Sequence, residues 1–321
     1  MKRSLAIAAL AFGLALPATA QEADEPVTPA SVVASASAEE WVTISPEDLL
    51  VMELAPDARG NSRTVVIQLA SAPFSQPWVE NIRTLARAHW WNGTSVYRVQ
   101  DNYVSQWGDA TEEKALPEGV TSPQDSYGTL IDQFDRDLED SSFGRTTDNY
   151  ASHTGFLDGW PVAGSFGKAL IDGALSETVD LIAWPIHCYG YIGVARDYAP
   201  DTGTGAELYT IIGQPQRHMD RNLAVVGRVI AGMEHLSSLP RGSGELGFYN
   251  EDEVDLRTPI LSVRLASEMA VPPSYEYLAT DSETFARYVA VRANRNDAFY
   301  TQPAGGVDVC SVQVPVRPAA D

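Results

Sequence analysis

The chain has 321 residues, of which 44% are hydrophobic, and its 43 acidic against 22 basic residues give a formal net charge of −21. This length and apolar content suffice for one large domain with additions or for two modest domains. So large a negative charge argues against nucleic acid and against an anionic membrane surface as partners, because their phosphate groups would repel it.

The first twenty residues have the pattern of a secretory signal peptide. Two basic residues at positions 2 and 3 precede an apolar run from Leu5 to Leu16, and the small residues ATA at 18–20 form a cleavage site. Residues 21–40 are rich in Ala, Ser, Pro and Glu without periodicity, so they are predicted to be a disordered linker. Since no later stretch is apolar for long enough to span a bilayer, we expect no membrane insertion and a periplasmic or secreted location.

The chain contains two cysteines, Cys188 and Cys310. An exported location permits a disulfide between them, and the chain-entropy model assigns about 4–5 kcal/mol to so long a loop. Two separate buried thiols explain the pattern equally well, because spacing does not establish proximity. The five histidines are scattered along the chain, so no metal site is predicted.

Two strands and a helix are predicted in the first part of the folded chain. Residues 48–54 and 64–70 are strand-like, and the turn-forming residues between them predict a β-hairpin. Residues 77–89 follow as a helix, because Val79, Ile82 and Leu85 recur at helical spacing and Pro77 suits the first turn.

The middle of the chain is irregular. Residues 110–185 carry many Gly, Pro, Asp and Ser residues, with one candidate short helix at Thr129–Leu138. A plain loop of this length is uncommon in a compact domain, so the segment is predicted to be an insertion packed on a sheet.

Regular patterns return after residue 186. Strands are predicted within 187–195, 207–212, 223–229, 260–265 and 307–316, with a short helix through Met233, Leu236 and Leu239 and a longer one capped by Ser282 and bearing Phe285, Tyr288 and Val289. Several strands, few helices and no repeated βα alternation predict a mainly β fold with a closed antiparallel sheet.

One stretch, WNGTSVYRVQDNYVSQWGD at 91–109, contains the components of a binding site. Arg98 stands among aromatic and aliphatic residues, with the amide of Gln106 eight positions later. Strand parity places the side chains of Tyr97 and Arg98 on opposite faces. A surface arginine in a salt bridge is the ordinary explanation. The functional alternative is a pocket for a small apolar ring with a nearby carbonyl group, without a nucleophile for hydrolysis.

The same stretch resembles the signature of the cyclophilin family, F-H-R-I-x-x-x-F-x-x-Q-G-G-D. The helix that precedes it carries matching residues at Pro77, Asn81 and Ile82. Downstream, GVA at 193–195 resembles the family's S-M-A, GAELY at 205–209 its G-S-Q-F-F, and VVGRV at 225–229 its V-F-G-K-V. The resemblance extends over roughly residues 48–266.

The resemblance implies a peptidyl-prolyl cis/trans isomerase on an eight-stranded antiparallel barrel capped by two helices. The barrel domain would occupy about residues 41–270, interrupted by the insertion at 110–185, and residues 271–321 would be a C-terminal extension. The resemblance implies Arg98 as the electrostatic catalyst and Gln106 as the glutamine that binds the substrate backbone. Substrate-binding positions carried over from the family are Tyr103, Val104, Ala195, Glu207, Tyr209, Met219 and Leu223. No cofactor or metal is implied.

Four positions depart from the family pattern. Arg196 stands where the family has asparagine, Glu207 replaces a glutamine, His218 a tryptophan and Leu223 a histidine. We expect a monomeric isomerase that acts on proline-containing unfolded or maturing exported proteins. The alternative is a catalytically weak cyclophilin-like binding module or chaperone of the cell envelope.

Overall fold

The computed structural model describes residues 27–124, 127–131, 144–145, 148–167, 170–171, 174–175, 180–297 and 299–319. The predicted signal peptide at 1–20 and the first part of the linker, residues 21–26, lie outside these ranges. Among the described residues, every helix is too short or too polar to cross a bilayer.

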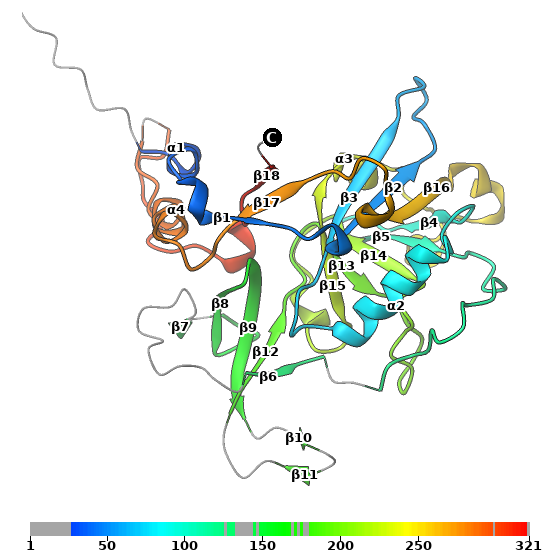
Figure 1. Cartoon of the computed structure of the whole chain (residues 1–321), viewed down its shortest axis with the longest axis horizontal. Coiled ribbons are helices and arrows are strands. Elements are labelled where there is room, and N and C mark those ends of the chain that lie inside the picture. The colour runs from blue at the N-terminus through cyan, green and yellow to red at the C-terminus, as the bar shows by residue number, and fades with distance from the viewer. Residues whose placement is uncertain are drawn as a thin grey trace, which may run out of the picture.

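Eight antiparallel strands close into a barrel in the order β13-β14-β5-β4-β16-β2-β3-β15 (Figure 1). Their bounds are Leu49–Leu54 (β2), Arg63–Leu69 (β3), Ser95–Val99 (β4), Val104–Gly108 (β5), Tyr191–Val194 (β13), Leu208–Ile211 (β14), Val225–Ala231 (β15) and Thr258–Leu265 (β16). These strands are rich in Val, Ile and Leu, which pack well on a pleated surface. The predicted fold class, a mainly β protein with a closed eight-stranded barrel, is confirmed.

The interior of the barrel is filled with side chains, as expected for eight strands. Leu50, Met52, Ile67, Trp107 and Val263 are among the residues that line a remaining gap of about 10 Å³. A gap of that size holds at most one water molecule. A ligand therefore has to bind on the outside of the barrel.

Two helices pack on the barrel, and they are unequal. The helix α2 (Gln76–Arg87) buries Trp78, Val79, Ile82, Leu85 and Ala86 and contacts β15 and β16. The second, α3 (Glu234–Ser237), is a single turn that contacts β3. Short 3-10 turns complete the connections: η2 (Pro46–Asp48), η3 (Arg217–Met219), η4 (Glu245–Gly247), η5 (Glu251–Leu256) and η6 (Ala266–Glu268).

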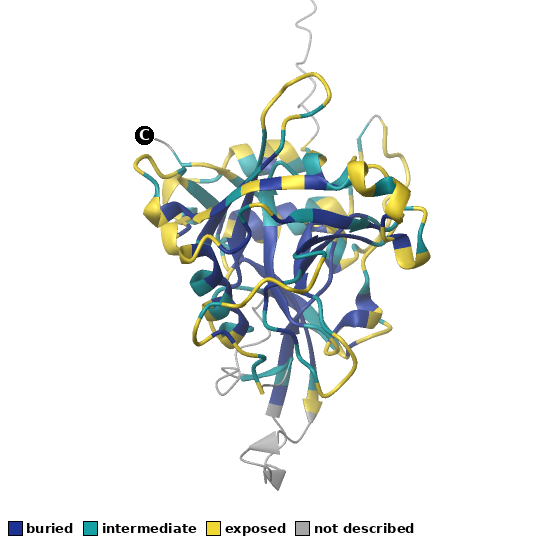
Figure 2. Ribbon diagram, turned by 90° about the vertical axis from the view of Figure 1, so that its right-hand side faces the viewer, coloured by how far each residue is buried: buried dark blue, intermediate teal, exposed yellow. Residues whose placement is uncertain are grey.

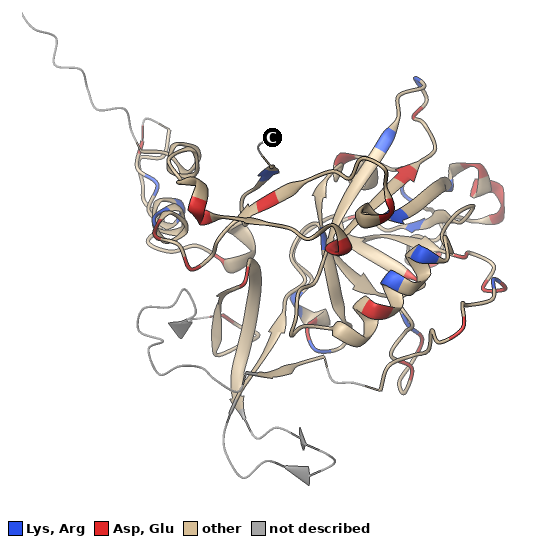
Figure 3. Ribbon diagram, viewed as in Figure 1, with Lys and Arg blue, Asp and Glu red and all other residues tan. Residues whose placement is uncertain are grey.

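The insertion forms a five-stranded antiparallel sheet of its own, in the order β6-β12-β9-β8-β7 (Figure 1). The bounds are Thr129–Ile131 (β6), Gly144–Arg145 (β7), His153–Leu157 (β8), Trp160–Gly167 (β9) and Asp180–Pro185 (β12), with a hairpin of Leu170–Ile171 (β10) and Ala174–Leu175 (β11). Strands β8, β9 and β12 carry few charges (Figure 3). This matches their burial against the rest of the protein.

The prediction of a helix at Thr129–Leu138 is wrong over its first three residues. These residues pair with β12, where Ile182 lies opposite Leu130. Pairing with a distant strand decided the local structure, and the sequence of the segment alone does not reveal that partner. The rest of the predicted helix lies outside the described residues.

The two ends of the described chain fold together beside the barrel. Strand β1 (Trp41–Thr43) pairs with β17 (Tyr275–Leu278), which pairs with β18 (Val316–Pro318). The helix α1 (Pro29–Ala34) contacts α4 (Glu283–Ala293), as Figure 1 shows. The Ser282 side chain caps α4 as predicted, accepting a hydrogen bond from the Phe285 amide.

Two predictions for these ends are wrong. The disordered linker was expected to reach residue 40, but α1 and η1 (Ala38–Glu40) are ordered. Six residues are too few for a periodic pattern, and α1 is instead held by a capping box of Thr28 and Ser31 and by burial of Val32. The final strand expected at 307–316 is the turn η7 (Val309–Ser311), with strand β18 beginning only at Val316.

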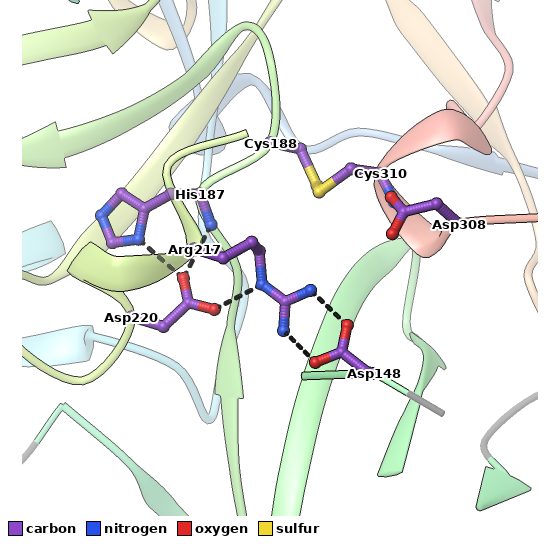
Figure 4. The surroundings of a disulfide bond; sticks show 7 residues. All are labelled: Asp148, His187, Cys188, Arg217, Asp220, Asp308 and Cys310. Atoms are coloured by element: carbon purple, nitrogen blue, oxygen red, sulfur yellow. Dashed lines mark hydrogen bonds and ion pairs between the residues drawn. A yellow bond between two sulfur atoms is a disulfide. The ribbon is translucent and has the colours of Figure 1, made fainter. Parts of the chain in front are cut away.

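A disulfide joins Cys188, just before β13, to Cys310 in η7 (Figure 4). The two Cα atoms lie 5.2 Å apart, and the bond closes a separation of 122 residues. Of the two alternatives left open by the sequence, the structure therefore contains the disulfide.

Buried residues of the barrel, the insertion and the extension form one continuous apolar core, which Figure 2 shows as the dark centre of the molecule.

Candidate active site

The strand pair β4–β5 positions the cation and the amide of the site. Arg98 lies opposite Gln106, whereas Val96 lies opposite Trp107, so the register shifts by one residue at Tyr97. An extra residue of this kind re-aims side chains and is frequent beside active sites. The predicted placement of Tyr97 and Arg98 on opposite faces is wrong for this reason, because both side chains reach Gln106.

The guanidinium of Arg98 is held by three acceptors. Its Nη1 donates to Gln106 Oε1 at 2.9 Å, its Nη2 to Gln100 Oε1 at 2.7 Å and its Nε to the Leu246 carbonyl at 2.7 Å. A guanidinium has five N–H groups, so two remain to donate to a substrate. The side chain is therefore fixed in direction while keeping part of its donor capacity.

Aromatic rings flank the same guanidinium. Its carbon lies 5.6 Å from the ring centroid of Tyr103 and 5.1 Å from that of Phe248. Burial lowers the pKa of Arg98 below its ordinary value, and the neighbouring tyrosines Tyr103 and Tyr97 oppose this shift. An arginine side chain remains protonated under these conditions. The site thus holds a permanent positive charge in a partly desolvated position, where its field is screened less than in water.

An apolar cluster lies next to this charge. Val104, Tyr209, Ile211 and Met219 form its buried core, and Tyr103, Ala195 and Leu223 pack against them. Tyr103 joins the two parts of the site, because its ring faces Arg98 while its hydroxyl donates to the Met219 sulfur at 3.0 Å. Six of the seven predicted substrate-binding residues therefore meet in one cluster.

Glu207, the seventh predicted binding residue, lies outside this cluster. Its carboxylate accepts hydrogen bonds from the Tyr97 hydroxyl at 2.6 Å and from the Asp109 amide at 2.8 Å. It therefore belongs to the hydrogen-bond network of Tyr97 and Gln106 and not to the apolar cluster.

The other departures from the family pattern lie at the edge of the cluster. His218 stacks on Tyr103, with ring centroids 6.4 Å apart. Arg196 donates to the carbonyl groups of Asn222 and Asp197, so its head group bridges two loops.

A buried polar chain contacts the cluster through Tyr209, and Figure 4 shows its part from His187 through Asp220 and Arg217 to Asp148. The Tyr209 hydroxyl lies 2.9 Å from His187 Nε2, and His187 Nδ1 lies 2.9 Å from the Asp220 carboxylate. The Asp220 carboxylate accepts from Nδ1, and in the neutral ring Nε2 is then the acceptor for the Tyr209 hydroxyl. A Cβ atom at Gly193 would lie 2.2 Å from the Tyr209 hydroxyl, so glycine there makes room for the tyrosine.

The same chain continues into the insertion. Arg217 donates to Asp220 at 2.7 Å and, through both Nη atoms, to Asp148 at 2.6 and 3.1 Å. Burial alone would raise the pKa of Asp148, but the hydrogen bonds from Arg217 hold it below its ordinary value. The insertion is therefore tied to the loop that carries Met219.

Replacing Arg217 with alanine is expected to lower the free energy of unfolding by roughly 3 kcal/mol, because two buried carboxylates lose their cation. Urea unfolding measures this change. The matched control is Arg87→Ala, which breaks an exposed pair with Glu47 and should change the value by less than about 1 kcal/mol. Equal effects of the two substitutions would contradict the structural role assigned to Arg217.

Several contributors to the site could not be recognised from the sequence. Strand parity predicts the wrong face for Tyr97, and the sequence indicates no role for Gln100, Leu246 or Phe248. Leu246 and Phe248 come from a loop about 150 residues away from Arg98, which no local pattern connects to it. Ile211 of the apolar cluster was not predicted either. The apolar residues of β14 were the one signal in the sequence that could have indicated its burial.

A metal site and a second cavity were also considered as places where function could reside. Within the described residues, no group of three or more His, Cys, Asp or Glu side chains is arranged to hold a metal ion. A cavity of about 1070 Å³ lies between α1, β15 and the C-terminal segment, and none of the predicted site residues lines it. The site described above combines a fixed cation and an amide with an apolar surface.

Three comparisons show which known proteins this chain is similar to. A family model described as cyclophilin type peptidyl-prolyl cis-trans isomerase/CLD matches residues 60–264. Cyclophilin AquaCyp293 from Hirschia baltica is similar in structure over 92% of this chain and 100% of its own, with 22% sequence identity and a TM-score of 0.62. A cyclophilin type isomerase from Cryptosporidium parvum, solved in the presence of the dipeptide Ala-Pro, covers 67% of this chain and 98% of its own at 10% identity and a TM-score of 0.36. No curated protein matches significantly.

Proposed function

The chain belongs to the cyclophilin type peptidyl-prolyl cis-trans isomerase family, and from this premise we propose that Arg98 catalyses rotation about X–Pro bonds whose proline ring binds to the apolar cluster. The observation that carries the proposal is the position of Tyr103. It faces the Arg98 guanidinium at 5.6 Å and also packs into the cluster of Val104, Tyr209 and Met219. A proline bound there lies beside a fixed donor.

The physical basis is the loss of amide resonance during rotation. Twisting a peptide bond opposes a barrier of about 18–20 kcal/mol, and the uncatalysed X–Pro step takes tens to hundreds of seconds. In the twisted state the proline nitrogen regains a lone pair that accepts a hydrogen bond. A donor aimed at that nitrogen stabilises the twisted state more than the planar states, which lowers the barrier.

The residues divide this work between them. Arg98 supplies the donor, with two N–H groups left over from its protein contacts. Gln106 is only 7% exposed, and its amide oxygen accepts a hydrogen bond from the guanidinium and holds it in place. The apolar cluster excludes water from the proline ring and strengthens the electrostatic contact. No proton transfer or covalent intermediate is required.

A protease-coupled assay with an X–Pro peptide tests this function. Wild-type protein should accelerate cis-to-trans conversion, and Arg98→Ala should lose most of the acceleration. If both proteins accelerate it equally little, the chain is better described as a cyclophilin-like binding module or chaperone.

We further propose that the substrates are proline-containing unfolded or maturing proteins outside the cytoplasm. Support comes from the signal-peptide pattern at residues 1–20 and from the disulfide, because such bonds persist in oxidising compartments. Expressed in a Gram-negative host, the protein should be recovered from the periplasm with Gln21 as its N-terminus, as measured by mass spectrometry. Recovery from the cytoplasm with an intact N-terminus would contradict the proposal.

A further inference from the structure

A continuous row of hydrogen bonds leads away from Arg98 into the protein. Arg98 Nη1 donates to Gln106 Oε1 at 2.9 Å, and Gln106 Nε2 donates to the Tyr97 hydroxyl at 2.6 Å. The Tyr97 hydroxyl in turn donates to Glu207 Oε2 at 2.6 Å, and the Asp109 amide donates to Glu207 Oε1 at 2.8 Å. Every donor in the row points toward Glu207. Its carboxylate is therefore the terminal acceptor that sets the direction of the whole row.

Building on the proposed isomerase function, we propose that Glu207 and Tyr97 are positioning residues for prolyl isomerisation. The ionised carboxylate of Glu207 orients the Tyr97 hydroxyl, the hydroxyl fixes the amide of Gln106, and the amide holds the guanidinium of Arg98 at the reacting bond. Neither residue needs to touch the substrate for this effect.

The setting of Glu207 fits the role. A Cβ atom at Gly108 would lie 2.0 Å from Glu207 Oε2, so glycine at that position leaves the space that the carboxyl group occupies. The titratable groups around it are Tyr97 from β4 and Asp109 and Glu112 from the loop after β5. Burial raises the pKa of Glu207 to about 7; the hydrogen bonds from Tyr97 and Asp109 oppose the rise, and the charges of Asp109 and Glu112 add to it.

Protonation of Glu207 reverses the direction of the hydrogen bond between Glu207 and the Tyr97 hydroxyl. Because Oε1 already faces an N–H donor, the added proton occupies Oε2 and points at Tyr97. The Tyr97 hydroxyl then loses its acceptor and can regain one only if the Gln106 amide turns over. That turn would present the Gln106 NH₂ group to the Arg98 guanidinium, and two donors cannot bond to each other. The ionised form is thus the one that orders Arg98.

Activity and the contribution of Glu207 to stability should respond to pH in opposite directions. The active, ionised form is lost as the pH falls through about 7, so kcat/KM should decrease in that range. For stability, the pKa of Glu207 in the folded protein lies above its ordinary value of 4.5, so the folded state binds the proton more tightly than the unfolded state does. The contribution of this group to stability is therefore greatest at low pH and decreases as the pH rises from about 4.5 to about 7. Protonation of Glu207 therefore does not itself destabilise the fold, so the loss of activity expected from this group is not a loss of folded protein.

The test measures kcat/KM by exchange NMR between pH 5.5 and 8.5, using a blocked X–Pro peptide without ionisable groups. Wild-type protein should gain about tenfold in kcat/KM across this range. Tyr97→Phe should lose about tenfold at pH 8.5 and have a flat profile, and Glu207→Gln should also have a flat profile. Glu112→Gln removes a neighbouring charge outside the row, so it should keep the sigmoidal profile with its midpoint at lower pH.

The outcomes separate this proposal from the function on which it rests. Wild-type activity that does not vary with pH, or a Glu207→Gln profile identical to that of the wild type, overturns the positioning role and leaves the isomerase intact. Absence of activity at every pH overturns both. A thermal unfolding series provides the second readout. The difference in midpoint between Glu207→Gln and wild type should increase with pH, and a constant difference would show that Glu207 does not titrate in this range.

Discussion

Alanine in place of Arg98 is expected to lower kcat/KM for an X–Pro peptide about 100- to 1000-fold. That is the usual loss when a preorganised donor to a transition state is removed. The Arg98 guanidinium is preorganised by Gln106, Gln100 and the Leu246 carbonyl, so its direction is set before a substrate binds. Peptide affinity should change much less, because the apolar cluster remains.

Two matched variants define what the arginine contributes. Arg98→Lys keeps the charge but lacks the planar fork that reaches three acceptors, so its kcat/KM should fall between those of wild type and Arg98→Ala. Arg87→Ala removes an exposed arginine of α2 and should leave kcat/KM unchanged. If Arg98→Lys equalled the wild type, charge alone would account for the effect and the argument from geometry would be wrong.

Loss of the disulfide is the second large effect that we expect. Cys310→Ser should lower the free energy of unfolding by about 4–5 kcal/mol in the chain-entropy model, because the bond closes a loop of more than 100 residues. Urea unfolding with and without reductant measures it. Reductant should destabilise the wild type by a similar amount and leave the variant unchanged. Equal unfolding midpoints for the oxidised wild type and the variant would contradict the prediction.

The barrel could be predicted from the sequence because its strands are locally encoded. The hairpin of β2 and β3, the helix α2 and the strands β14, β15 and β16 all carry apolar patterns of the correct period. The patterns alone predicted a closed antiparallel sheet. The order of the segments is also that of a known family, and this resemblance supplied the number of eight strands and the two capping helices.

The insertion and the ends of the chain could not be predicted in the same way. Residues 129–131 became a strand through β12, and β1 pairs with β17 from the opposite end of the chain. The helix α1 depends on a local cap and on burial of Val32. Such pairings depend on tertiary contacts, and short segments contain no hydrophobic periodicity from which they could be predicted.

The candidate site shows the same division. Arg98, Tyr103, Val104 and Gln106 were expected to be neighbours because one motif with fixed spacing contains them. The resemblance to the family added the other expected members of the cluster, Ala195, Tyr209, Met219 and Leu223. The shift in register at Tyr97 has no signature in the sequence, so the hydrogen bonds from Gln106 through Tyr97 to Glu207 were not foreseen. Glu207 was assigned to the binding pocket because it replaces a family glutamine, but it contacts the polar network.

The pocket lacks the histidine that the family pattern places at position 223, but a histidine from another segment contacts it. The resemblance places a histidine at Leu223, and none is there. A histidine from a different segment, His187, contacts the pocket residue Tyr209 from behind, and Gly193 leaves the space for its hydroxyl. His187, Tyr209 and Gly193 thus form one physical unit, in which the histidine bonds the tyrosine hydroxyl and the glycine leaves space for it.

The central claim is that Arg98 catalyses isomerisation of a proline held by the adjacent apolar cluster. Exchange NMR on an X–Pro peptide, together with methyl spectra of the protein, tests both parts in one sample. We predict cis–trans exchange peaks with wild-type protein and greatly weakened peaks with Arg98→Ala, while peptide-induced shifts at Val104 and Met219 persist in both. Equal exchange rates for the two proteins, or peptide shifts confined to residues outside the cluster, would contradict the claim.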